Sequence, residues 1–143
     1  MFMAAAPEGQ SELDHEAEEV AILDATKAKD DRPPLAQVQV EESGALEFLC
    51  ERVRLDGPFE ALHISCHGDI LAGDGGDPSP VLLLETATGE GDATSPGRLV
   101  DEMGGDLPPL VFVSACRTAE RGAGRKTAGA PEGYRQGSLA DAP

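Results

Sequence analysis

The sequence has few basic residues and no long apolar run. Lysine and arginine together number 11, against 27 aspartates and glutamates, which gives the 143 residues a net charge of -16. A field of this sign repels phosphate backbones and anionic lipid surfaces, so we expect neither nucleic acid nor a membrane as a partner. No apolar run approaches the roughly 20 residues of a membrane span, and the opening MFMAAAP lacks the basic and apolar regions of a signal peptide. These absences predict a cytoplasmic protein.

The sequence also lacks the cysteine pattern of a disulfide-bonded protein and the glycine pattern of a phosphate-binding loop. Cysteine occurs only at Cys50, Cys66 and Cys116, an odd and widely spaced set that argues against a disulfide framework and favours free thiols in a reducing compartment. Neither of the two glycine-rich phosphate loops, G-x-G-x-x-G and G-x-x-x-x-G-K-[ST], follows a predicted strand. A small nucleotide-binding module is therefore the last of the functions to consider.

Short apolar runs alternate with helical periods along the chain, whose length fits one domain, residues 1–143. The pattern predicts strands at 1–6, 35–41, 59–66, 81–85 and 107–116. It predicts helices that begin near Ser11, near Ser43 and at Ser95-Pro96. Strands that alternate with helices favour a parallel sheet covered on both faces. Residues 68–80 show no period, and 117–137 are rich in glycine, alanine and charge, so both segments are predicted to be loops.

The first helix is the most secure of these predictions. Ser11 can cap it, acidic residues crowd its amino-terminal half, and apolar residues recur at spacings of three and four. The apolar face is predicted to contain Leu13, Ala17, Val20, Ala21 and Leu23. In the second helix, Leu46, Leu49, Cys50 and Val53 are expected to share a face.

The stretch ALHISCHGDI, residues 61–70, places two histidines and a cysteine within five positions. In a strand His63 and His67 share one face, about 13 Å apart at roughly 3.3 Å per residue, and Cys66 points to the other face, toward the core. Haem attachment needs a cysteine at position 63, and zinc needs a second pair of ligands at suitable spacing. The acidic loop that follows does not fit a calcium-binding pattern. We therefore expect no metal and no cofactor.

The ends of two predicted strands are the better candidates for a catalytic site. Ligands of open α/β sheets bind outside the carboxyl ends of the strands. His67 and Gly68 end one predicted strand, and Cys116 ends another. If these strands are neighbours, an imidazole and a thiol lie within reach of each other and can act as base and nucleophile toward a carbonyl.

The blocks LHISCHGD (residues 62–69) and LVFVSACRTA (residues 110–119) resemble the two catalytic blocks of the CHAT-domain peptidases, relatives of caspases and separase. Residues 1–23 and 81–90 resemble the family's opening strand, turn and acidic helix and its segment between the blocks, so the likeness runs from about residue 1 to about residue 141. The separation of His67 and Cys116, 116 - 67 = 49 residues, is similar to the spacing of about 50 in caspases. Ser114 and Thr118 replace the glutamine and glycine of the caspase signature, so caspase substrate preference does not transfer.

The resemblance implies a three-layer caspase-like α/β fold with a mainly parallel sheet flanked by helices. It implies a cysteine endopeptidase in which His67 is the base and Cys116 the nucleophile, with the backbone N-H groups of Gly68 and Cys116 around the oxyanion. Asp69 and Arg117 are expected at the pocket rim. The implied partner is a protein or peptide substrate, without a cofactor, and the family's effector or repeat modules are not encoded here. The family's domain continues where this chain ends at Pro143, so its carboxyl-terminal part is expected to be missing.

The alternative is a non-catalytic caspase-like module that binds or regulates a partner. Missing strands leave an unpaired sheet edge, which favours association with another chain. A partner-binding role therefore competes with peptidase activity on the same sequence.

Overall fold

The computed structural model describes residues 1–10, 13–29, 32–72 and 78–115. Its elements alternate between strands and helices at first and then include a run of consecutive strands. The strands are β1 (Phe2–Ala4), β2 (Val40–Glu41), β3 (Ala61–Ala72), β4 (Pro78–Glu85), β5 (Gly91–Thr94) and β6 (Leu110–Ala115). The helices are α1 (His15–Thr26), α2 (Leu46–Asp56) and α3 (Pro96–Met103), the last followed by a short 3-10 turn, Gly104–Asp106.

The strands form one sheet in the order β2-β1-β3-β4-β5, and β6 also pairs with β3. The pairs β1/β2, β1/β3 and β3/β6 are parallel, whereas β3/β4 and β4/β5 are antiparallel. The α/β class is therefore confirmed, but the expectation of a mainly parallel sheet is wrong, because the sheet is mixed.

The length of β3 explains why the sheet is mixed. Residues 61–66 pair with β6, and residues 63–65 among them also pair with β1, whereas residues 67–72 pair with β4. The two halves of β3 therefore have different partners. The sequence pattern predicts a loop from Gly68 onward, and residues 68–72 are instead strand. Their hydrogen bonds to β4 supply the regularity that the local sequence, with its glycine and aspartate, does not indicate. The rest of the predicted loop up to residue 77 lies outside the described residues.

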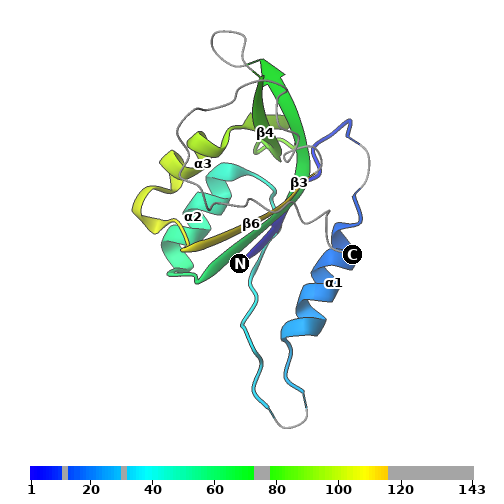
Figure 1. Cartoon of the computed structure of the whole chain (residues 1–143), viewed down its shortest axis with the longest axis vertical. Helices are drawn as coiled ribbons and strands as arrows, with labels where there is room; N and C mark the ends of the chain where they lie inside the picture. Colours follow the sequence, from blue (N-terminus) through cyan, green and yellow to red (C-terminus); the bar gives the residue numbers. More distant parts are fainter. Residues whose placement is uncertain (11–12, 30–31, 73–77, 116–143) are drawn as a thin grey trace, which may run out of the picture.

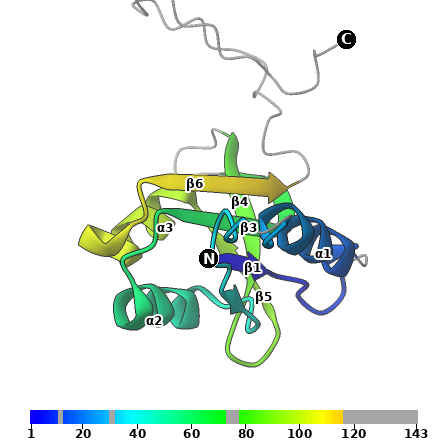
Figure 2. The same ribbon diagram turned by 90° about the horizontal axis from the view of Figure 1, so that it is seen from below.

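Helices lie on both faces of the sheet, with α2 and α3 on one side and α1 on the other (Figures 1 and 2). The hydrophobic core is on the α2 and α3 side, where Leu62 and Ile64 of β3 meet Leu49 of α2, and all three are completely buried. The predicted face of α2 is confirmed, since Leu46, Leu49, Cys50 and Val53 are buried. The alternation of β3 thus sends residues 62, 64 and 66 into the core and residues 63, 65 and 67 toward α1.

The predicted face of α1 is not buried. Val20 is 57% exposed and Leu23 is 40% exposed, and no residue of α1 is fully buried. The helix is capped by Asp14, whose carboxylate accepts the backbone N-H of Ala17 at 3.1 Å, and the predicted cap, Ser11, lies outside the described residues. His15 and Glu18, one turn apart, form hydrogen bonds with side chains of β3. Contacts with β3 rather than helix amphipathicity therefore decide which face of α1 turns inward.

The other elements follow the sequence pattern with changed bounds. Ser95 caps α3 as expected, its hydroxyl accepting the N-H of Arg98 at 3.1 Å. Only Val40–Glu41 of the predicted strand 35–41 pairs with β1, and β5 has too few apolar residues to be predicted. Among the helices that the structure describes, none has both the length and the apolar character that a membrane span requires.

Candidate functional site

His67 occupies the point where β3 changes partners. Cys66 is the last residue of β3 that pairs with β6, and His67 is the first that pairs with β4, opposite Leu83. The His67 side chain is 9% exposed and lies on the α1 side of the sheet. The histidine is thus held by a regular strand at the junction of two ladders, and it does not end the strand as the sequence suggested.

The two predicted blocks lie on neighbouring strands. β3 and β6 are parallel, and their register runs from Ala61 opposite Leu110 to Cys66 opposite Ala115. The residue before His67 is therefore beside the residue before Cys116. Cys116 itself and Arg117 lie outside the described residues, as does the predicted loop 117–137.

Gly68 and Asp69 lie within β3, opposite Leu82 and Val81 of β4, and both are partly exposed. The carboxylate of Asp69 accepts the backbone N-H of Ile70 at 2.7 Å. This contact orients the Asp69 side chain along its own strand. Its predicted place at a pocket rim and the oxyanion role of the Gly68 N-H remain predictions.

Cys66 is excluded as the nucleophile by its surroundings. Its side chain is 1% exposed and packs in the core on the α2 side. Burial raises the pKa of the Cys66 thiol to about 12, so the thiolate is scarce at neutral pH. The sequence-based placement of Cys66 in the core, away from His67, is confirmed.

On the α1 side, the residues before His67 form a polar cluster with α1. The Glu18 carboxylate lies between His63 and Ser65: one oxygen is 3.0 Å from His63 Nε2, and the other accepts the hydrogen bond of the Ser65 hydroxyl. Ser65 Oγ is also 3.1 Å from His15 Nδ1. His63 further packs edge-on against Phe2, with ring centroids 5.4 Å apart. We call His15, Glu18, His63 and Ser65 the α1–β3 cluster.

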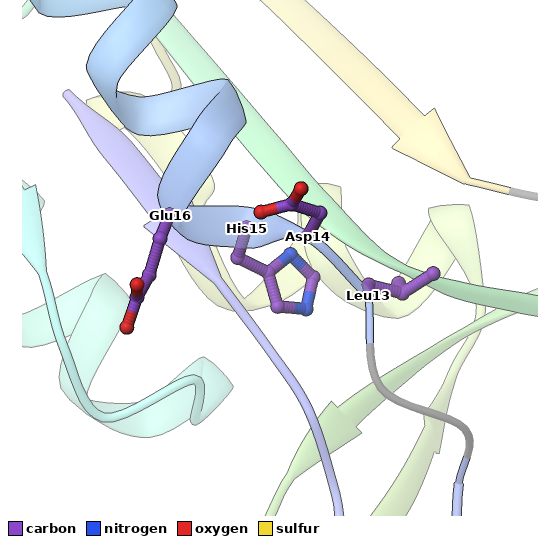
Figure 3. A pocket seen from close by; sticks show the side chains of 4 residues that line it. All are labelled: Leu13, Asp14, His15 and Glu16. Atoms are coloured by element: carbon purple, nitrogen blue, oxygen red, sulfur yellow. The ribbon is translucent and has the colours of Figure 1, made fainter.

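A cavity of about 590 Å³ opens at the amino-terminal end of α1. Its described lining consists of Leu13, Asp14, His15 and Glu16. Figure 3 shows His15 beside Asp14, with Glu16 pointing away from the other three. His15, which lines this cavity, contacts Ser65, and Ser65 is two residues before His67 on the same face of β3.

The sequence did not indicate the α1–β3 cluster. The available signal was weak: two polar residues one helical turn apart, His15 and Glu18, and a strand face that carries His63, Ser65 and His67 without an aliphatic residue. Within residues 1–10, 13–29, 32–72 and 78–115, no three histidine, cysteine or acidic side chains are grouped so that they could hold a metal ion.

Comparison with known proteins gives no match: no family model matches the chain, and no curated protein matches it. The candidate site therefore rests on the geometry above and on the motif residues themselves.

Proposed function

We propose that the chain is a cysteine endopeptidase with a caspase-like three-layer fold, in which Cys116 is the nucleophile and His67 the general base and acid. The observation that carries the proposal is the parallel pairing of β3 and β6, whose last paired residues are Cys66 and Ala115. Covalent geometry keeps the Cα of each following residue about 3.8 Å from its predecessor. His67 and Cys116 are the residues that follow this last pair in the chain.

The reaction needs only these two side chains and backbone donors. His67 takes the thiol proton, and the Cys116 sulfur attacks the carbonyl carbon of the scissile peptide bond. The C-N bond breaks as His67 gives the proton to the leaving amine, and a thioester remains on Cys116. Water then attacks the thioester, His67 accepts a proton from it, and the acid product leaves with the thiol restored. The N-H groups of Gly68 and Cys116 are the proposed donors to the oxyanion.

The mixed sheet supports the assignment of His67 in particular. A base must keep its orientation through both half-reactions, and His67 is held between two hydrogen-bonded ladders and is nearly buried. The neighbouring cavity at Leu13–Glu16 provides room for substrate residues on the same side of the sheet.

The decisive experiment is active-site labelling with a peptidyl acyloxymethyl ketone, followed by mass mapping of the modified cysteine. We expect labelling at Cys116, and its loss in Cys116→Ala and His67→Ala. Cys66→Ala serves as the matched control and should keep the label, because Cys66 lies in the core. Labelling at Cys66 but not at Cys116 would refute the assignment.

A non-catalytic role as a partner-binding module is the second candidate, and one observation favours it. β6 has both faces partly open, with Phe112 53% exposed and Val113 41% exposed. This alternative predicts that partner binding persists in Cys116→Ala and is lost in Phe112→Glu. The peptidase proposal predicts that peptide cleavage is lost in Cys116→Ala and persists in Phe112→Glu.

A further inference from the structure

Helix α1 is attached to the sheet by polar contacts instead of a buried apolar face. None of its residues is fully buried, whereas α2 on the opposite face buries four side chains. Farther along α1, a cavity of about 290 Å³ is lined by Ile22 and Thr26 of the helix and by Phe2, His63 and Phe112 of the strands. The α1–β3 cluster supplies hydrogen bonds between α1 and the sheet.

The donors and acceptors of this cluster can be assigned by elimination. An ionised carboxylate only accepts hydrogen bonds, so His63 Nε2 must donate to one oxygen of Glu18 and the Ser65 hydroxyl to the other. The single hydroxyl hydrogen of Ser65 is then used, and His15 Nδ1 must donate to Ser65 Oγ. In a neutral His15 ring, Nε2 is consequently an acceptor. The Nε2 atom of His15 is buried and has no hydrogen-bond partner among the described residues. The His15 side chain lines the 590 Å³ cavity.

We propose that Glu18 is a positioning residue: by accepting from His63 and Ser65 it holds α1 on the His67 side of β3, and through Ser65 it sets the tautomer of His15. Ser65 is 3% exposed, so its hydroxyl depends on these partners for its hydrogen bonds. The cluster thereby fixes the start of α1, where Leu13–Glu16 line the 590 Å³ cavity. The structural part of this proposal stands by itself, and its effect on substrate binding rests on the proposed peptidase function.

The structural part is tested on the whole chain by hydrogen exchange and by nitrogen NMR of the histidine rings. Glu18→Ala should speed exchange of the α1 amides roughly tenfold, the effect of losing two hydrogen bonds, although alanine is the better helix former. The same variant should shift neutral His15 away from the Nδ1-H tautomer at pH 8. Glu18→Gln, which keeps one acceptor oxygen and replaces the other with a donor NH2 group, should fall between Glu18→Ala and the wild type.

Glu19→Ala is the matched control, because Glu19 is the adjacent acidic residue of α1 and its replacement by alanine removes the same charge. It should leave both the exchange rates and the His15 tautomer unchanged. Unchanged exchange in Glu18→Ala, or equal changes in Glu18→Ala and Glu19→Ala, would overturn the proposal. Ser65→Ala provides an independent route to the same result, since it should release His15 while leaving the Glu18–His63 contact in place.

The functional part is tested by steady-state peptide cleavage. A displaced cavity wall weakens substrate binding more than it slows the chemistry, so Glu18→Ala should raise KM roughly tenfold and change kcat little. A fall in kcat with unchanged KM would assign Glu18 a different role. If the wild-type chain cleaves no peptide, the peptidase proposal fails, whereas the exchange and tautomer measurements still decide whether Glu18 positions α1.

Discussion

Residues 66 and 67 differ in environment more than their adjacency in the sequence suggests. One side chain of the pair enters the core and the other faces α1, because successive residues of a strand point to opposite faces. Burial on the core side raises the pKa of the Cys66 thiol to about 12. Although Cys66 and His67 are adjacent in the sequence, the strand thus makes Cys66 a core residue and leaves His67 as a candidate catalytic residue.

This division predicts how Cys66 responds to pH. A raised pKa keeps the thiol protonated, so native Cys66 should react very slowly with iodoacetamide at pH 8, and its rate should rise about tenfold per pH unit until the pH approaches the pKa. Site-resolved mass mapping measures the rate at each cysteine, and the urea-unfolded chain, in which Cys66 reacts freely, is the control. Rapid labelling of native Cys66 at pH 8 would show that its side chain is not in the core.

At the scale of elements, α2 is the principal apolar support of the sheet. Leu49 is completely buried, while Leu55 on the same helix is 72% exposed. We expect Leu49→Ala to reduce the free energy of unfolding by about 2–5 kcal/mol, because it removes buried methyl groups and leaves a cavity. The matched Leu55→Ala should change it by less than about 0.5 kcal/mol. Urea denaturation measures both, and equal losses in the two variants would contradict the assigned face of α2.

The two helices show which parts of the fold a sequence can predict. In α2 the apolar period and the buried face coincide, so Leu46, Leu49, Cys50 and Val53 could be named in advance. In α1 the apolar residues Val20 and Leu23 stay exposed, because Glu18 and His15 find partners on β3. Those partners are 45 or more residues away in the chain, and no local period indicates them.

The extension of β3 could not be predicted for a similar reason. Residues 68–72 are held in the strand by pairing with β4, a non-local interaction that overrides the weak strand propensity of glycine and aspartate. The sequence-based site, in contrast, required only that the two motif strands be neighbours, and the β3–β6 register meets that condition.

At the scale of the whole molecule, an acidic chain carries an uncharged, apolar strand on its surface. β6 consists of Leu110–Ala115, the only strand with which it pairs in the described residues is β3, and Leu110 and Phe112 are about half exposed. A strand with apolar side chains on both faces is typical of a sheet interior. The edge of β6 that is unpaired among the described residues offers backbone and apolar groups to another strand, whereas the net charge of -16 opposes the approach of a second copy.

These two opposed effects predict an association that increases with salt. At about 0.1 M ionic strength charges are screened beyond roughly 10 Å, so added salt should weaken the repulsion between copies and leave the attraction of the β6 edge intact. Light scattering across a concentration series should show larger species at 0.5 M than at 0.02 M sodium chloride. Phe112→Glu should remove this increase. Leu35→Glu, which adds the same charge at a residue that is 86% exposed and outside β6, should keep it. Association that decreases with salt would mean that ion pairs, and not the apolar edge of β6, hold the copies together.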